Sequence, residues 1–545
     1  MKTLRDSAGM RWTALLLLAL AMFCSYVFMD ILSPIKDLMQ ETRGWDSASF
    51  GRMQGAEVFL NVYVFFLIFA GIILDKMGVR FTAVLSGAVM LFGGLIKFYA
   101  CSEAFIGTSL ETWFTNNLNW NGELPVIGAI LPFAAGMPAS AKLAALGFMF
   151  FGCGCEMAGI TVSRGIVKWF KGRETALAMG SEMALARLGV ATCMIFSPYF
   201  AKLGGEIHVD NSVKFGVVLL CIALIMFITY FFMDKKLDSQ TGEAEEKDDP
   251  FKISDLGKIF TSLGFWLVAL LCVLYYSAIF PFQKYAVNML QCNLTLTPAD
   301  PTTYWGGSTE SFPIGVTLVQ YFLMLVVAAG SFSSNFIKNN KGLKFGLMGL
   351  AVVALVVYCY MGYMRGTAET IFAVFPLLAV AITPILGNYV DHKGKAATML
   401  MLGSLLLVIC HLTFAFVLPG VSAASPAGGV VVAYITILVL GASFSLVPAA
   451  LWPSVPKLVD EKIIGSAYAA IFWIQNIGLG LFPALIGIVL NNTNPEGTAA
   501  HELNYTWALV MLAALGIAAL LISIYLRAVD KKKGYGLEQP NIKAE

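Results

Sequence analysis

Apolar stretches long enough to cross a lipid bilayer follow one another along the whole chain. A membrane-spanning helix needs about 20 mostly apolar residues, and only 13% of these 545 residues are charged. A soluble protein would carry about 25% charged residues, so we predict an all-α, polytopic membrane protein. The fourteen predicted spans are 12–32, 54–74, 82–104, 143–168, 176–200, 212–233, 263–287, 313–336, 343–364, 367–386, 397–418, 429–451, 466–490 and 504–527.

The even number of spans places both termini on the same side of the membrane. When the N-terminus is put in the cytoplasm, most of the 36 lysine and arginine residues fall into cytoplasmic segments. Cytoplasmic loops are enriched in these residues, so we predict cytoplasmic termini. The compact loops and the lack of a long sorting tail favour a bacterial inner membrane over a lysosome.

A short charged motif punctuated by glycine occurs twice, about 300 residues apart. Each copy has a glycine four residues before an aspartate and a second glycine three residues after it, with basic residues around them. Recurrence of a tight cytoplasmic turn indicates a transporter built from repeats. We predict a gating role for the two turns, whose residues are Gly71, Asp75, Lys76, Gly78 and Arg80, and Gly387, Asp391, Lys393 and Gly394.

The repeat also divides the chain into two six-helix bundles. The first bundle is residues 1–233, and the second is residues 263–530. A polar, mixed-charge stretch (234–262) is the predicted cytoplasmic linker, and 531–545 form a cytoplasmic tail. The distance between matched points of the repeats locates two insertions. They are a long outside loop at 105–142, interpreted as a structured or interfacial element, and an extra two-helix hairpin at 313–364.

Glu156 and Arg187 are the strongest candidates for substrate binding. A charge at mid-membrane is costly unless paired or hydrated, so such residues are functional candidates. Helix rise places both about 17 Å from the cytoplasmic face, on neighbouring helices. One acid and one arginine at equal depth could bind the ammonium and carboxylate of a zwitterion. The alternative interpretation is a structural salt bridge.

Several further polar and aromatic residues could line the same cavity. Tyr275, Tyr276, Gln475 and Asn476 are predicted to contribute from the second half. Phe280, Gln283 and Trp473 could line it as well, and Glu57 and Asp30 could face it, although Asp30 is interpreted mainly as an interfacial residue. Arg164, Glu182 and His411 are weaker functional candidates. His411 is interpreted mainly as a packing residue, and Arg164 as a residue that pairs near the inner turn, with Glu182 as a potential partner.

The sequence gives no indication of an enzyme. It contains no metal-ligand cluster, no nucleophile–base arrangement and no nucleotide-binding loop. The 10 cysteines lie mostly in apolar runs, where they behave as small packing residues. The net charge of +2 gives no reason to expect a nucleic-acid partner, and no cofactor is predicted.

The repeated Gly/Asp turn resembles the signature turn of the major facilitator superfamily. Within it, the chain is similar to the lysosomal dipeptide transporter family. The stretches that carry this likeness are Gly152–Glu156, Trp169–Glu174, Ala186–Gly189, Tyr275–Tyr276, Phe280–Phe282, Leu451–Pro453, Gly465–Tyr468 and Gln475–Gly478. The resemblance implies that Glu156 binds a peptide amino terminus and Arg187 its carboxyl terminus.

The chain departs from these families at three points. Phe148 stands where many superfamily members carry an arginine linked to proton coupling, and Glu182 stands where a neutral polar residue is expected. The hairpin 313–364 is not part of the family core.

These observations predict a secondary or facilitative carrier that works by alternating access on dipeptides or similar small zwitterions. A uniporter and a proton-linked symporter both fit. One alternative is an organic anion or sugar carrier that uses Arg187. Another is a transport-inactive sensor or scaffold.

Overall fold

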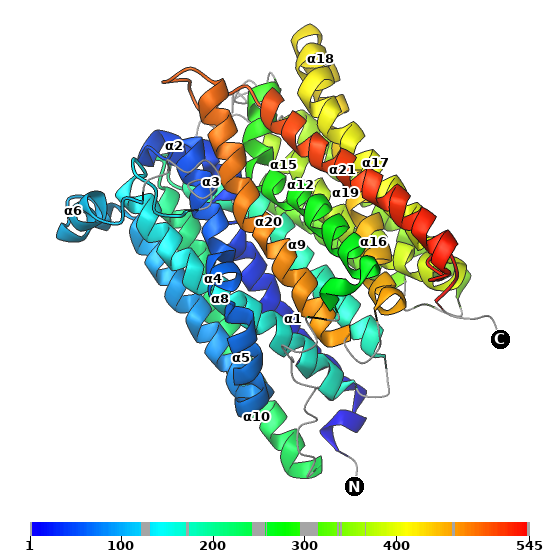
Figure 1. The fold of residues 1–545 in the computed structure, drawn as a ribbon. Helices are drawn as coiled ribbons and strands as arrows, with labels where there is room; N and C mark the ends of the chain where they lie inside the picture. The colour runs from blue at the N-terminus through cyan, green and yellow to red at the C-terminus, as the bar shows by residue number, and fades with distance from the viewer. Residues whose placement is uncertain are drawn as a thin grey trace.

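The computed structural model describes residues 3–120, 131–170, 174–241, 257, 259–294, 314–334, 337, 340–365, 367–459 and 464–541. These residues form helices almost throughout, with one isolated β-bridge between Trp120 and Ala134. Figure 1 shows the first-half helices (blue through cyan to the green of α10) beside those of the second half (green to red). The predicted all-helical architecture of two six-helix bundles with an added hairpin is confirmed.

The first half is built from α1 (Ala8–Met29), α3 (Ser47–Gly55), α4 (Phe59–Tyr63), α5 (Phe66–Cys101), α8 (Ala139–Trp169), α9 (Thr175–Ala201) and α10 (Val209–Thr241). Short helices on the side opposite the termini are α2 (Lys36–Arg43) and α6 (Ser109–Asn116), and 3₁₀ turns include η2 (Ser33–Ile35), η3 (Ala56–Val58) and η4 (Glu103–Phe105). We call the side on which α1 begins and α21 (Thr506–Lys533) ends the inner side, and the opposite side the outer side.

The second half is built from α12 (Leu263–Asn293), α15 (Ala368–Phe372), α16 (Val374–Lys393), α17 (Ala396–Leu412), α18 (Leu418–Ala424), α19 (Pro426–Leu458), α20 (Ile464–Thr493) and α21. The extra hairpin is α13 (Ile314–Ser333) and α14 (Lys341–Arg365). The inner turn that we predicted for this hairpin includes Lys338, which lies outside the described residues.

Thirteen long apolar helices in the described part of the chain could cross a membrane. Our prediction has one more span because α5 contains a break. Gly78 has φ 79° and ψ 166° inside α5, a conformation in which side-chain-bearing residues are strained. The second crossing is therefore α3, α4 and the beginning of α5, and the third is the rest of α5. The predicted fourteen crossings agree with the structure on this basis.

The hairpin packs at the boundary between the two bundles. Helix α13 contacts α9 of the first half and α16 of the second. The Thr192 hydroxyl donates to the Tyr321 hydroxyl at 3.3 Å, and Phe196 meets the Tyr321 ring edge to face. The hairpin is therefore part of the helical packing and not a separate appendage.

Glycines let α3 and α20 approach closely near the outer side. A Cβ atom at Gly51 or Gly55 would collide with the backbone of Pro483 or Gly480, and one at Gly487 would collide with Ser47. We call these three glycines and Gly480 the glycine seam. Tyr285 of α12 adds hydrogen bonds to the carbonyl groups of Ser47 and Pro483, both at 2.9 Å. The two halves are thus held together on the outer side.

The predicted linker and outside loop are described only in part. Helix α10 continues to Thr241, so the beginning of segment 234–262 is helical, while 242–256 and 258 lie outside the described residues. In the loop 105–142, the Lys142 ammonium donates to the Phe114 carbonyl at 3.0 Å and to the Asn119 side chain. This buried lysine fixes the described part of the loop to α8.

Candidate substrate site

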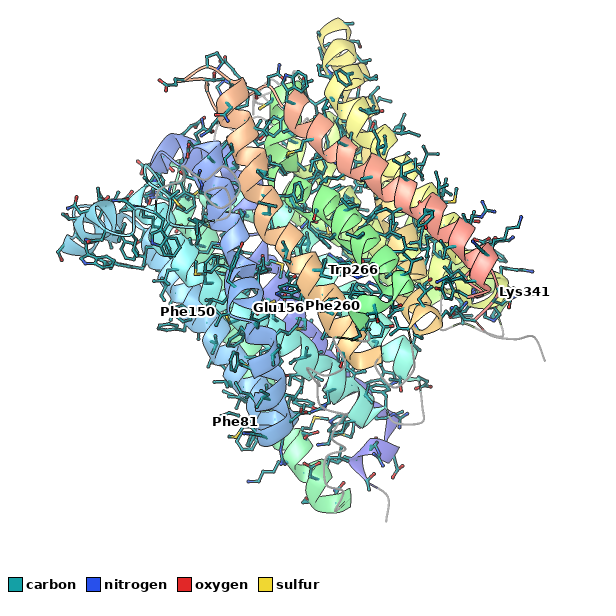
Figure 2. All side chains as sticks on the ribbon, in the orientation of Figure 1. Phe81, Phe150, Glu156, Phe260, Trp266 and Lys341 are labelled. Carbon is teal, nitrogen blue, oxygen red and sulfur yellow. The ribbon has the colours of Figure 1, made fainter. Side chains whose placement is uncertain are left out.

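Glu156 lies near the middle of the bundle, where the two halves meet. It projects from α8, is half-buried, and accepts a hydrogen bond from the Asn476 side chain of α20 at 3.2 Å. Figure 2 shows Glu156 between first-half helices and α20. Two residues predicted independently for substrate binding are therefore direct neighbours across the boundary.

Arg187 is surrounded by aromatic rings from both halves. Its guanidinium carbon lies 5.0 Å from the ring centre of Phe280, 4.9 Å from that of Phe444 and 5.9 Å from that of Tyr26. Aromatic faces attract cations at these distances. Among the described residues Arg187 forms no ion pair with Glu156 or with any other carboxylate. The alternative interpretation, a structural salt bridge between Glu156 and Arg187, therefore has no support in this structure.

The aromatic wall of the second half extends beyond Phe280. Tyr276 stacks on Phe280 with ring centres 5.4 Å apart, and its hydroxyl accepts a hydrogen bond from the Trp452 indole at 3.2 Å. Tyr275 is placed differently, because it is fully buried and shares a 2.9 Å hydrogen bond with Ser443 of α19. Of the two predicted tyrosines, only Tyr276 lies against the aromatic group around Arg187.

The other candidates of the second half have assigned partners. The Gln475 side chain accepts a hydrogen bond from the Cys272 thiol at 3.2 Å, and the Trp473 indole donates to the Val62 carbonyl at 3.0 Å. His411 is fully buried. Its Nδ1 atom lies 2.9 Å from the Leu407 carbonyl oxygen, and its ring packs against Phe282. Its position agrees with a packing role.

Comparisons with known proteins show which proteins this chain is similar to. The model of the Major Facilitator Superfamily matches residues 124–368. The lysosomal dipeptide transporter MFSD1 of Bos taurus is 25% identical over 373 residues, which are 67% of this chain and 62% of that protein. The human MFSD1 is 23% identical over 419 residues, or 75% of this chain and 70% of that protein. The predicted resemblance to this transporter family is confirmed.

Solved structures agree in architecture. The nucleoside transporter NupG has a TM-score of 0.57 at 11% identity, covering 94% of this chain and 99% of its own. The chain has the major facilitator fold. A bacterial homologue of the human drug peptide transporters PepT1 and PepT2 has a TM-score of 0.56, also at 11% identity, over 96% of this chain and 99% of its own. At these identities the likeness shows the fold alone.

Within the major facilitator fold, the first Gly/Asp turn is surrounded by charged side chains of its own half. Asp75 accepts a 2.7 Å hydrogen bond from Arg164 of α8, so the structure gives Arg164 a partner at the inner turn that we had not assigned. Arg80 lies 3.2 Å from Asp238 of α10. Lys76 is exposed.

Asp234 of α10 is the centre of this arrangement. It is fully buried and accepts hydrogen bonds from Lys168 at 2.7 Å and from the Trp169 indole at 2.8 Å. Arg80 lies 3.9 Å away. The first turn is therefore connected to α8 and α10 through ionised groups.

The second Gly/Asp turn contacts the C-terminal segment instead. Asp391 accepts a 2.9 Å hydrogen bond from Asn541. The backbone N–H groups of Lys395 and Ala396 donate to the carbonyl groups of Glu538 and Leu537 at 3.2 and 3.1 Å. We call residues 534–541, which follow α21, the C-terminal strap. Lys393 is exposed, and Gly387 has open space around its Cα.

Sequence reasoning missed three buried lysines. Lys36, Lys97 and Lys284 are buried, yet they lie in or beside predicted spans. These lysines could have been found because each is a charged residue in or beside an apolar run. We had applied this criterion only to Glu156, Arg187 and a few other residues. Among the described residues, no group of three or more His, Cys, Asp or Glu could hold a metal ion.

Proposed function

We propose that this protein is a carrier that moves dipeptides or similar small zwitterions by alternating access, with Glu156 and Arg187 as the ends of the binding site. The named function of the MFSD1 relatives supports the substrate class. Because the chain spans only 62% of the bovine relative, the substrate belongs to the proposal.

The observation that carries the proposal is that Glu156 and Arg187 do not pair with each other and that each contacts different residues. Both belong to the first half, but each contacts the second half: Glu156 through Asn476, and Arg187 through Phe280 and Phe444. A ligand bound to both charges would touch both halves, as a site at the repeat interface requires.

The chemistry of the two ends fits a free peptide. Glu156 supplies an acceptor for a peptide ammonium, with the Asn476 amide beside it. Arg187 presents a guanidinium that no described carboxylate occupies, and its planar fork suits a peptide carboxylate. The aromatic rings around Arg187 keep the guanidinium in place without competing for its donors.

Terminal blocking of the peptide tests each end separately. In liposomes containing the full-length protein, we would measure counterflow of a dipeptide against its N-acetylated and C-amidated forms. We expect the wild-type protein to prefer the free dipeptide about 10- to 100-fold over either blocked form, because a lost charge-assisted hydrogen bond costs about 1.5–3 kcal/mol. Glu156→Gln should lose discrimination at the amino end only, and Arg187→Ala at the carboxyl end only.

Glu182→Gln is the matched control. Glu182 is half-buried like Glu156, but it lies on α9. This variant should keep both preferences. Unchanged dipeptide affinity in folded Glu156→Gln and Arg187→Ala would overturn the proposal.

The same assay separates the alternatives. The aromatic surroundings of Arg187 also favour an organic anion, and loss of transport in Arg187→Ala alone, with anions accepted, would support that reading. Sugars form a third substrate panel. Absence of any solute movement, together with a stable bound protein partner, would support a sensor or scaffold.

The orientation and the host membrane belong to the same proposal. The concentration of lysine and arginine in the inner segments supports cytoplasmic termini. A bacterial inner membrane is the proposed location, and labelling of an introduced cysteine at exposed Lys393 from outside intact cells would contradict this orientation.

A further inference from the structure

Three buried charged side chains and one half-buried carboxylate lie between the candidate substrate site and the outer side. Asp30 at the end of α1, Glu57 in η3 and Lys97 in α5 belong to the first half, and Lys284 in α12 belongs to the second. Lys284 is one helical turn beyond Phe280, which contacts Arg187. We call these four residues the buried charge cluster.

Lys284 connects the halves through the two carboxylates. Its ammonium lies 2.8 Å from Asp30 and 3.9 Å from Glu57, and Gln283 also donates to Asp30, at 2.7 Å. The side chains of Asp30, Lys284 and Glu57 are 1%, 9% and 15% exposed. A bond this deeply buried is strong in the closed arrangement and costly to break without compensation.

Lys97 belongs to the cluster although it has no hydrogen-bond partner among the described residues. It is fully buried, and its ammonium lies 3.6 Å from the ring centre of Phe148. The Phe148 ring also faces Lys284, at 6.0 Å. With Lys97 ionised, the two lysines balance the two carboxylates while the halves are in contact.

Few other titratable groups face the cluster. Helix α8 contributes Glu156 and the Cys155 thiol, α5 itself contributes the Cys101 thiol, and α9 contributes the Cys193 thiol. Helix α20, which packs on η3, has no Asp, Glu, Lys, Arg or His between Ile464 and Thr493. No additional cation is therefore available from these elements to replace Lys284.

Opening of the outer side changes the charge balance. If α12 separates from α1 and η3, Lys284 leaves with the second half. Asp30, Glu57 and Lys97 stay together in the first half, with one negative charge in excess. Two neighbouring carboxylates that share too little positive charge favour uptake of a proton.

We propose that Asp30 and Glu57 form a proton-binding site for which Lys284 competes, so that a proton is bound when the outer side opens and released when it closes. The proposal rests on the alternating-access part of the proposed function and not on its substrate. Because the open state binds one more proton than the closed state, the open-to-closed ratio should rise as pH falls, by up to about tenfold per pH unit.

The distance between the outer ends of the two halves is the direct measurement. Spin labels would be placed at Glu41→Cys in α2 and Glu496→Cys after α20, both exposed. The full-length protein would carry Cys221→Ser, because Cys221 is the exposed native cysteine and the other nine are half-buried or buried. Distances would be recorded in lipid nanodiscs without substrate, from roughly pH 5 to roughly pH 8.

We expect the population with the longer distance to grow as the pH is lowered. Asp30→Asn and Glu57→Gln should each raise that population near neutral pH and weaken its pH dependence. Lys284→Gln should also weaken the pH dependence, because the competitor is removed. Asn288→Ala is the matched control: it removes the 3.1 Å bond between Lys36 and Asn288, which joins the halves without a carboxylate. It should favour opening but keep the pH dependence.

Two results would overturn the proposal: a wild-type distance distribution that is the same at both ends of the pH range, or a pH dependence that persists in the folded Asp30→Asn/Glu57→Gln double variant. Thermal unfolding checks that each variant folds. If Lys284→Gln does not fold, the single variants Asp30→Asn and Glu57→Gln decide the question. A pH-dependent opening without dipeptide transport would contradict the substrate proposal alone.

Discussion

The two inner Gly/Asp turns have the same backbone device but different partners. Gly78 and Gly394 occupy the same place in the motif, and both have positive φ, 79° and 73°. The first turn is connected to α8 and α10 through ionised side chains, whereas the second is held by the C-terminal strap, largely through backbone groups. The motif therefore determines the turn, and the surrounding chain determines how that turn is held.

The sharpest test of this difference is removal of the buried carboxylate behind the first turn. Asp234→Asn removes the buried carboxylate that binds Lys168 at 2.7 Å, the Trp169 indole and Arg80, and leaves Lys168 with the more exposed Asp238. Breaking a buried ion pair from one side costs about 3–5 kcal/mol, so we expect a large loss of thermal stability. Asp238→Asn, at a more exposed position, should cost clearly less. Equal losses in the two variants would contradict the central role of Asp234.

Alanine substitution of the two turn glycines should have different effects on the C-terminal strap, because only Gly394 contacts it. Gly78→Ala and Gly394→Ala should each cost about 1–2 kcal/mol, because an alanine is strained at positive φ. At Gly394 the added Cβ would also collide with the backbone of Glu538 and Gln539. We therefore expect Gly394→Ala to accelerate hydrogen exchange in the strap, with no such change for Gly78→Ala. Protection of the strap that is unaffected by Gly394→Ala would argue against their contact.

A smaller effect is expected from the side chain that joins the strap to α17. The Glu538 carboxylate accepts hydrogen bonds from the Thr398 N–H at 2.8 Å and from its hydroxyl. This is a cap on the first turn of α17, and loss of such a cap costs about 1 kcal/mol. Glu538→Ala should increase exchange at Thr398 while leaving the first turn unchanged, and Glu538→Gln should restore part of the protection.

The smallest effect should be a difference in salt dependence. Asp75 and Arg164 are partly exposed, with side chains 31% and 16% exposed, and such pairs contribute about 0.5 kcal/mol. Asp75→Asn should lower stability at low salt and have little effect at high salt, because salt screens the pair. Asp391→Asn should show no comparable salt dependence, since its described partner, Asn541, is neutral.

The helices and their grouping were largely predictable from the sequence because apolar length and basic residues act locally. The prediction separated spans 54–74 and 82–104, and the non-helical conformation of Gly78 inside α5 marks the same division in the structure. The hairpin was located by its lack of a repeat partner. The position of the hairpin between α9 and α16 could not be predicted, because the faces of an apolar helix do not specify which helices it contacts.

Tertiary partners were the part that the sequence could not supply. Glu156 and Arg187 were predicted as candidates from their depth in the membrane, but their neighbours Asn476, Phe280 and Phe444 come from the other half of the chain. Lys284 and Asp30 are likewise far apart in sequence. The strap looks like an ordinary polar tail, since backbone hydrogen bonds to a distant turn leave no pattern in side-chain types.

The glycine seam has a practical consequence for capturing this protein in a second shape. At Gly51, Gly55 and Gly487 even one methyl group would meet the opposing backbone, which has no side chain to rotate away. Alanine there would act as a wedge that prevents the outer ends from meeting, while the interior of each bundle is untouched. Such a variant would be a natural starting point for structure determination of an outward-open form.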